Sequence, residues 1–294
     1  MRVGLIGLGT MGSRFARRLR GAGYTPLGFD RVEALVVRAT AEGSTPAGSV
    51  GAVVSGTDVI LTSLPMPEDL LDVIHQAAAF ARTGQVFVDL STVDPSTARS
   101  AADMLASRGA RFLDAPVSGG TTGAEAGTLA VMIGGEATVL DTVRPILSSF
   151  AARIVHCGPV GAGSVVKLAN QMLVAAHIAA AGEAARFARA NGIPIETLLD
   201  VVSAATGDSL MFRRTLRDHY LTGDYAPTFA LRLLMKDLRL YAAESARAGT
   251  LGPVGENARG TYETAMAANL GEEDYAAAIK VLMGEVESPA NVLA

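Results

Sequence analysis

A lysine interrupts an apolar segment in the middle of the chain. Lys167 stands between Val166 and Leu168 in a stretch with helical spacing, and Asn170 and Gln171 follow three and four positions later. Residues with that spacing share one face of a helix. A positioned lysine can act as a general acid–base, but its reference pKa of about 10.4 requires desolvation or a cationic neighbour for work near neutral pH. A surface lysine whose stem covers apolar residues is the alternative interpretation.

Three glycines near the N-terminus have the spacing of a nucleotide-binding loop. Gly7, Gly9 and Gly12 form Gly-x-Gly-x-x-Gly between residues 3–6, which predict a buried strand, and a segment with helical spacing. In this setting the first glycine permits a tight turn, the second lets the backbone approach a pyrophosphate, and the third lets the helix pack against the strand. The N-terminus of the helix attracts phosphate through its N–H groups and dipole. The motif predicts a dinucleotide site, and a plain flexible turn is the alternative.

An acidic residue follows the second predicted strand, residues 24–29. Asp30 lies about 20 positions after the glycines, where a carboxylate binds the adenosine ribose 2′-hydroxyl of NAD and repels the 2′-phosphate of NADP. Arg31 could hold that phosphate, so NADP stays possible. The alternative role of Asp30 is to cap the helix that begins near Glu33. The sequence thus favours NAD as the cofactor.

A second glycine-rich segment follows the predicted strand at residues 111–115. Ser118, Gly119 and Gly120 stand at its centre. Successive backbone N–H groups in such a segment can converge on an anion. We expect a second anion there, most simply a substrate carboxylate, and a flexible loop without a ligand is the alternative.

Alternating strands and helices must position these residues. Strands are predicted at 59–61, 85–90, 129–135 and 153–156, and helices at 68–81 and 96–108. Loops after the strands of an open parallel sheet gather at its carboxyl edge, where ligands bind. Leu64, Pro65 and Thr92 fall in such loops, although each alone would be an ordinary turn or cap residue.

The character of the chain changes after residue 160. Residues 162–190 predict one Ala-rich helix about 40 Å long, which ends at Asn191-Gly192. Further helices are predicted at 195–205, 229–248, 254–270 and 275–286. The predicted fold class is α/β, with a Rossmann-type doubly wound sheet in residues 1–160. An all-α C-terminal domain in residues 161–294 follows, with the long helix between the domains.

The composition narrows the function classes. The 294 residues are 49% hydrophobic and 18% charged, which is typical of a well-buried globular protein. A net charge of −4 with dispersed Lys and Arg gives no footprint for nucleic acid. We expect no apolar segment long enough to span a membrane and no room for a signal peptide before the first strand. Cys157 is the only cysteine, so an internal disulfide is excluded and a cytoplasmic location is expected.

Four motifs in this order resemble the β-hydroxyacid dehydrogenase family, which includes 3-hydroxyisobutyrate dehydrogenases and tartronate semialdehyde reductases. The resemblance runs from Val3 to about Val286, nearly the whole chain. The segments that carry it are GLIGLGTMG at 4–12, DAPVSGG at 114–120, GAGSVVKLANQ at 161–171 and KDL at 236–238. It implies a C-terminal domain like that of 6-phosphogluconate dehydrogenase.

The resemblance also implies an activity and a set of roles. The enzyme would transfer a hydride between NAD(P) and a small 2- or 3-hydroxy acid or its semialdehyde, of the 3-hydroxyisobutyrate or tartronate semialdehyde/glycerate type. Lys167 would be the catalytic acid–base, with Asn170 beside it, and Asp237 would orient Lys236 over the nicotinamide. The implied substrate contacts are Ser118, Gly119, Gly120 and Gln171. The implied cofactor contacts are Gly7, Gly9, Thr10, Met11, Gly12, Asp30, Arg31, Leu64, Pro65, Thr92 and Lys236.

Two positions qualify the resemblance. Many members have two asparagines after the lysine, whereas this chain has Asn170-Gln171, as in the tartronate semialdehyde reductase branch, so either amide could face the substrate. NADP-preferring relatives tend to have Asn-Arg where this chain has Asp30-Arg31. The family also implies a homodimer or homotetramer. The Ala-rich helices agree with this, since they offer more apolar surface than one short bundle would bury.

The chain lacks the characteristic residues of other dehydrogenase classes. Short-chain dehydrogenases need Tyr-x-x-x-Lys, and none of the six tyrosines has a lysine four positions later. One cysteine and four scattered histidines are a poor source of zinc ligands, so no metal is expected. Imine reductases share the architecture but usually replace the lysine, and a non-catalytic dinucleotide-binding scaffold would not need it. These two remain as alternatives.

Overall fold

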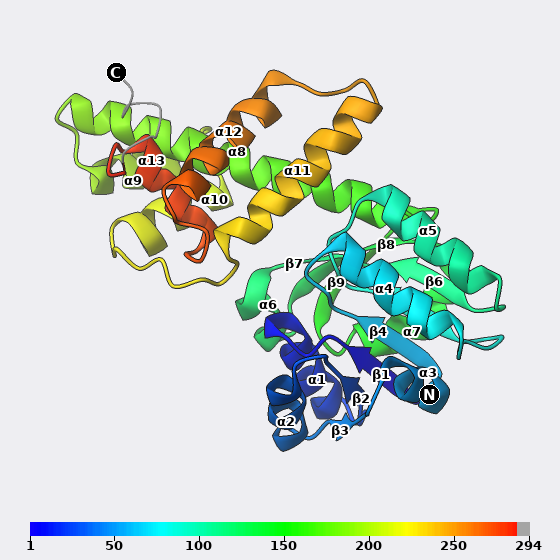
Figure 1. The fold of residues 1–294 in the computed structure, drawn as a ribbon. Coiled ribbons are helices and arrows are strands. Elements are labelled where there is room, and N and C mark those ends of the chain that lie inside the picture. The colour runs from blue at the N-terminus through cyan, green and yellow to red at the C-terminus, as the bar shows by residue number, and fades with distance from the viewer. Residues whose placement is uncertain (287–294) are drawn as a thin grey trace. The chain divides into compact units, whose positions relative to one another are not determined.

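The computed structural model describes residues 1–286 and divides into two compact units, Met1–Lys167 and Leu168–Ala294 (Figure 1). Residues 287–294 of the predicted C-terminal domain lie outside the described residues. The first unit is an α/β sheet structure and the second is helical. This confirms the predicted fold class.

The first unit is built on one sheet of nine strands. They are β1 (Val3–Ile6), β2 (Leu27–Phe29), β3 (Thr45–Pro46), β4 (Val59–Thr62), β5 (Val86–Asp89), β6 (Arg111–Asp114), β7 (Val117–Ser118), β8 (Leu129–Gly134) and β9 (Ala151–Gly158). Their order is β3-β2-β1-β4-β5-β6-β8-β7, with β9 paired to β8. The pairs from β3 to β6 are parallel, whereas β8 runs antiparallel to β6 and β7. The strand order reverses between β1 and β4, which makes the carboxyl ends of these strands the expected ligand crevice.

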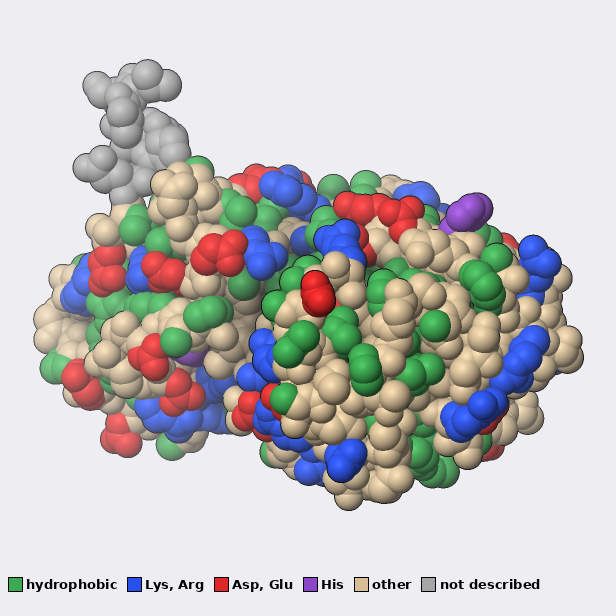
Figure 2. Space-filling model, turned by 60° about the horizontal axis from the view of Figure 1, so that its bottom comes forward, with side chains coloured by type: hydrophobic (Ala, Val, Ile, Leu, Met, Phe, Trp, Pro, Cys, Tyr) green, Lys and Arg blue, Asp and Glu red, His purple; other side chains and the backbone are tan. Residues whose placement is uncertain are grey.

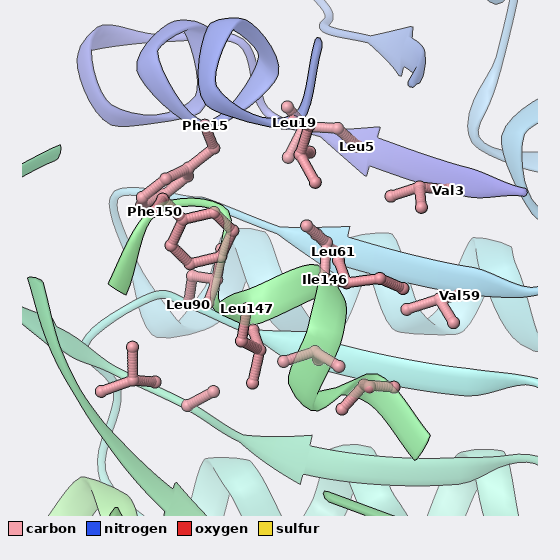
Figure 3. Packing of buried hydrophobic residues seen from close by; sticks show 14 of the residues in the cluster. Val3, Leu5, Phe15, Leu19, Val59, Leu61, Leu90, Ile146, Leu147 and Phe150 are labelled. Atoms are coloured by element: carbon pink, nitrogen blue, oxygen red, sulfur yellow. The ribbon is translucent and has the colours of Figure 1, made fainter. Parts of the chain in front are cut away.

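Helices cover both faces of this sheet. They are α1 (Thr10–Gly21), α2 (Glu33–Ala41), α3 (Val50–Gly56), α4 (Pro67–Ala78), α5 (Pro95–Ala106), α6 (Gly120–Ala126) and α7 (Ala137–Leu147). Side chains alternate between the faces, so Val88 belongs to a core with α1, α6 and α7, and Phe87 to a core with α3, α4 and α5. In the first core the rings of Phe15 and Phe150 pack with centroids 4.8 Å apart (Figure 3). Burial on both faces explains the continuous apolar runs of the strands.

The second unit is a set of helices. Its elements are α9 (Ile195–Ser203), α10 (Leu210–Arg214), the π-helix η1 (Thr215–Tyr220), α11 (Leu231–Arg247), α12 (Pro253–Ala267), the 3₁₀-helix η2 (Tyr275–Ala278) and α13 (Ile279–Leu282). The long helix α8 (Ala162–Ala190) begins in the first unit and has the predicted bounds. Its Ala175 and Ile178 lie in a core with α11 and α12.

Three local predictions differ from the structure. The strand predicted at 24–29 shortens to β2 because the N–H of Tyr24 bonds to Leu19 at the end of α1. The helix predicted at 275–286 is instead the short pair η2 and α13, started by the carboxylate of Asp274 on the N–H of Ala276. The pair α10 and η1 was not predicted, although Ser209 caps α10 by accepting the N–H of Phe212.

The division between the units falls seven positions after the predicted end of the first domain. The first turn of α8 packs tightly against the sheet: a Cβ added at Gly163 would overlap the carbonyl oxygen of Met132 and lie 2.9 Å from that of Asp114. The residues up to Lys167 therefore belong to the first unit, although the helix continues to Ala190.

We expected no apolar segment long enough to span a membrane, and the structure contains a helix of that length. Within residues 1–286, α8 is long and apolar enough to cross a membrane by composition alone. A long core helix passes the same test, and α8 places buried residues in the packed core of the second unit. Of the apolar window of α8, 39% is buried within the chain.

Candidate active site

The glycine loop after β1 closes tightly around one open position. Gly7 has φ +92°, and a Cβ there would overlap the carbonyl oxygen of Ser63 in the loop after β4. A Cβ at Gly12 would overlap the carbonyl oxygen of Gly7. No atom lies within 4 Å of a Cβ placed on Gly9, the N-cap residue of α1, and the first turn of α1 carries no acidic side chain. The open Gly9 position and the uncapped N-terminus of α1 fit a pyrophosphate.

Neighbouring residues hold this loop. Asp30 Oδ2 accepts the N–H of Leu8 at 2.8 Å, and its Oδ1 accepts the N–H of Val32 at 2.9 Å. The N-cap residue of α2 is Val32, so the cap interpretation of Asp30 is wrong. Asp30 instead braces the glycine loop from the end of β2. The exposed Arg31 points its guanidinium to Asp69 Oδ1, 3.3 Å away.

The loops after β4 and β5 are joined through a buried carboxyl group. Ser91 Oγ accepts the N–H of Leu64 at 2.9 Å and donates to Asp89 Oδ1 at 2.6 Å, and Thr62 Oγ1 donates to the same oxygen at 2.7 Å. Burial raises the pKa of Asp89 to about 6, against these hydrogen bonds, which lower it. Asp89 is not among the predicted site residues, although an acidic residue at the end of a buried strand is a usable signal.

The remaining predicted cofactor residues of the first unit lie around these loops. Thr10 is exposed at the start of α1 and Met11 packs against the first core. Pro65 is exposed in the loop after β4, and Thr92 is half-buried in the loop after β5. The structure therefore brings Gly7, Gly12 and Leu64 together, while the guanidinium of Arg31 is paired with Asp69.

The segment after β6 is ordered by secondary structure on both sides. Ser118 ends β7, which pairs with β8, and α6 begins at Gly120. Gly119 and Gly120 have φ +132° and +63°, a backbone that favours glycine, and they form the turn between strand and helix. These residues therefore belong to β7, α6 and the turn between them.

A second buried carboxylate joins this segment to α8. Asp114 Oδ1 accepts the N–H of Gly161 at 2.7 Å, and Asp114 Oδ2 accepts the N–H of Ser164 at 2.8 Å. Burial raises the pKa of Asp114, while the two N–H groups act in the opposite direction. The carboxylate therefore links the strand that leads to Ser118 with the first turn of the helix that carries Lys167.

Lys167 is the last residue of the first unit, and its side chain is 6% exposed. The interpretation of Lys167 as a snorkelling surface residue is therefore wrong.

Four polar residues of the second unit form a directed chain. Gln171 Nε2 donates to Asp237 Oδ2 at 2.7 Å, and Asn170 Nδ2 donates to Gln171 Oε1 at 3.1 Å. Lys236 Nζ lies 2.9 Å from Asp237 Oδ1. Because a carboxylate only accepts, Asp237 sets the orientation of the Gln171 amide, which in turn sets that of Asn170. The implied role of Asp237 beside Lys236 thus extends to both amides.

Among residues 1–286, no group of three or more His, Cys, Asp and Glu could hold a metal ion. On the face shown in Figure 2, positive and negative side chains are interspersed.

Two family models together cover most of the chain. Residues 2–158 match the NAD binding domain of 6-phosphogluconate dehydrogenase, and residues 161–282 match the model described as NAD-binding of NADP-dependent 3-hydroxyisobutyrate dehydrogenase. Both models describe NAD-binding domains, and the glycine loop predicts the same cofactor. NAD as cofactor, with NADP possible, is thereby confirmed.

Individual relatives cover nearly the whole chain. The 2-(hydroxymethyl)glutarate dehydrogenase of Eubacterium barkeri is 35% identical over 96% of this chain and 94% of its own length. The NAD-dependent L-serine dehydrogenase of Pseudomonas aeruginosa is 33% identical, with 95% of this chain and 97% of that protein covered. The structure of Mycobacterium tuberculosis 3-hydroxyisobutyrate dehydrogenase with L-serine has a TM-score of 0.90 at 34% identity, covering 96% of this chain and 99% of that one.

Proposed function

Since the chain belongs to the β-hydroxyacid dehydrogenase family and is an NAD-dependent hydroxyacid dehydrogenase, we propose that its substrate is a small 2- or 3-hydroxy acid and that Lys167 is its general acid–base. The observation that carries the proposal is the buried Lys167 on a helix whose first turn is bonded to Asp114, just before the Ser118 segment. Ser118, Gly119 and Gly120 bind the substrate carboxylate.

In the proposed reaction the cofactor handles the hydride and the protein handles the proton. NAD, when bound, supplies the acceptor for the hydride of the carbinol carbon. Lys167 Nζ takes the proton of the substrate hydroxyl during oxidation and returns it to the carbonyl oxygen during reduction. Holding the carboxylate on the Ser118 segment fixes the distance from this hydroxyl to Nζ, which makes the proton transfer intramolecular in effect.

The substrates named for the relatives share one feature. 2-(Hydroxymethyl)glutarate, L-serine and 3-hydroxyisobutyrate are all carboxylates with a hydroxyl on the β-carbon. This favours a substrate whose reacting hydroxyl is on the β-carbon, as 3-hydroxyisobutyrate and glycerate both offer, over an acid with a hydroxyl on the α-carbon alone. The test is a panel of short 2- and 3-hydroxy acids and their semialdehydes, each with NAD and NADP, followed by the absorbance of the reduced nicotinamide. Turnover confined to acids with a hydroxyl on the α-carbon alone would contradict this preference.

The two amides after Lys167 have different proposed roles. Gln171 is buried and directs its amide at Asp237, whereas Asn170 is half-buried and donates one N–H to Gln171. We therefore assign Asn170 to the substrate and Gln171 to the support of Asn170. Lys236, beside Asp237, is assigned to the nicotinamide end of the cofactor.

The proposed cofactor preference is NAD over NADP. Asp30 places its carboxylate at the end of β2 and repels a 2′-phosphate there, while Arg31 is engaged with Asp69. Asp30→Ala is expected to raise kcat/KM for NADP relative to NAD by about tenfold or more, equivalent to about 1.4 kcal/mol. Because Asp30 also braces Leu8, both absolute values will fall somewhat. A wild-type enzyme with the higher kcat/KM for NADP would show that Asp30 does not set the preference.

We also propose that the chain forms a homodimer or homotetramer through α8. Val166, Leu173 and Phe187 recur at intervals of seven and fourteen residues on this helix, and all three are exposed in the single chain. Such a stripe is typical of a helix that packs against another helix. Light scattering is expected to give at least twice the 30.2 kDa of the monomer. The double variant Leu173→Glu/Phe187→Glu should dissociate it, and Val254→Glu on α12 is the control for an exposed apolar residue elsewhere. A wild-type mass near 30.2 kDa would contradict the proposal.

The same observations bear on the two alternative functions and on the cellular location. An imine reductase or a non-catalytic scaffold has less support, because Lys167 is buried and the named relatives above 30% identity are dehydrogenases. A cytoplasmic location is proposed, in keeping with a single cysteine and relatives that are metabolic dehydrogenases.

A further inference from the structure

Two glycines leave the space that the Asp114 carboxylate occupies. A Cβ at Gly134 on β8 would overlap Asp114 Oδ1, and a Cβ at Gly163 on α8 would lie 2.9 Å from Asp114 Oδ2. The Asp114 side chain is completely buried. Any larger residue at Gly134 would displace the carboxylate, so three separate segments of the sequence are adapted to this one group.

The carboxylate fixes the first turn of α8 at two points. Its oxygens each accept one N–H, from Gly161 before the helix and from Ser164 in its first turn. Two bonds to a rigid group restrict both translation of the helix and rotation about its axis. Lys167 follows Ser164 by three residues, less than one turn of 3.6 residues, so any rotation at Ser164 redirects Lys167.

We propose that Asp114 is a positioning residue for the reaction, which sets the direction of Lys167 relative to the substrate segment at Ser118. The inference rests on the proposed function of Lys167 as acid–base. Asp114, Ser118 and Lys167 all belong to the first compact unit. Asp114 lies four residues before Ser118 and accepts N–H groups from the turn that leads to Lys167, so one side chain connects the two ends of the proton-transfer geometry.

A purely structural role makes a different prediction. A carboxylate that only caps a helix contributes stability, and its loss lowers the melting temperature without a specific effect on the folded enzyme. Asp94 provides this comparison, because it caps α5 by accepting the N–H groups of Ser96 and Thr97. Asp94 has no proposed part in catalysis.

The decisive experiment is a double-mutant cycle with Asp114→Asn and Lys167→Ala in the full-length protein. Asparagine keeps the size of the side chain but turns one acceptor into an N–H donor, which faces the N–H of Gly161 or Ser164. At saturating substrate and below the melting temperature of every variant, Asp114→Asn is expected to lower kcat about 10- to 100-fold, as a small misplacement does. The dissociation constant for NAD should stay within about twofold, because the glycine loop is untouched.

The double variant distinguishes the roles. If Asp114 acts through Lys167, Asp114→Asn in the Lys167→Ala background should cost no more than about twofold, since the lysine it positions is already absent. Asp94→Ala is the matched control and should lower the melting temperature while keeping the wild-type kcat.

Two results overturn the inference: full additivity of the two substitutions, or a wild-type kcat in folded Asp114→Asn. Activity retained by Lys167→Ala alone would instead refute the proposed function, so the two failures are separable. If Asp114→Asn does not fold, Gly163→Ala enters the same cycle, because its Cβ would overlap the carbonyl oxygen of Met132, press on Asp114 Oδ2 and so shift the first turn of α8.

Discussion

Lys167→Ala is expected to lower kcat by about 10²–10⁴, the range commonly lost with a positioned acid–base. Lys167 is buried on the first turns of α8, and the bonds of Asp114 that anchor this helix do not involve its side chain. The variant should therefore fold and bind NAD nearly as the wild type does. Steady-state kinetics with the best hydroxy acid of the panel, together with a fluorescence titration of NADH, measure both quantities.

The arginine variant tests the chemistry of the lysine rather than its charge. Lys167→Arg should be nearly as inactive as Lys167→Ala, because a guanidinium does not deprotonate in the working pH range. The pH–rate profile of the wild type should contain a limb that both variants lack. Lys280→Ala is the matched control, since Lys280 pairs with Glu273 outside the proposed site. A Lys167→Ala enzyme with more than about a tenth of the wild-type kcat would refute the catalytic assignment.

Two glycines of the N-terminal loop should respond oppositely to a larger side chain. Gly9→Val is expected to raise the dissociation constant for NAD at least about tenfold, or about 1.4 kcal/mol, while the melting temperature changes little. The reason is that the Cβ position of Gly9 is open, and a side chain there fills the space for the pyrophosphate. Gly12→Val should instead prevent folding or lower stability severely, because its Cβ would overlap the carbonyl oxygen of Gly7.

Thermal unfolding and calorimetric titration with NAD separate these effects. Each variant serves as the control for the other, because both replace a glycine with valine and the two positions are three residues apart at the start of α1. A Gly9→Val protein that binds NAD with wild-type affinity would show that the pyrophosphate does not approach Gly9.

Much of the fold follows from local sequence patterns. The bounds predicted for α8 match the structure because an Ala-rich helix with Asn191-Gly192 after it carries its own stop signal. The roles of Gly7 and Gly12 were also predictable, because their spacing reflects contacts within one loop and its helix. The segment at 275–286 was predicted as one helix, but it starts as the 3₁₀-helix η2 after Asp274, which bonds to the N–H groups of Thr228 and Ala276; helical periodicity does not show these bonds.

The support of the candidate site was harder to predict than its motifs. Asp114 binds N–H groups 47 and 50 positions away, and Asp237 binds an amide 66 positions away. Such partners depend on how strands and helices pack, so the sequence shows a carboxylate without its role. Asp30 shows the same limit on a smaller scale. Its spacing predicted a ribose contact, with a helix cap as the alternative, and did not show that its side chain accepts the N–H groups of Leu8 and Val32.

The start of α8 within the first unit affects whether that unit can be produced as a separate fragment. A cofactor-domain fragment that stops at residue 160 would lack the N–H groups of Gly161 and Ser164, so the carboxylate of Asp114 would lose both of these hydrogen bonds. A hydrogen bond to a charged group contributes about 1.5–3 kcal/mol, which is a large part of the stability of a small domain. A fragment that ends at Lys167 keeps both bonds but exposes the cut end of a helix. The first unit therefore depends on the first turn of α8 for its own hydrogen bonds, although most of that helix belongs to the second unit.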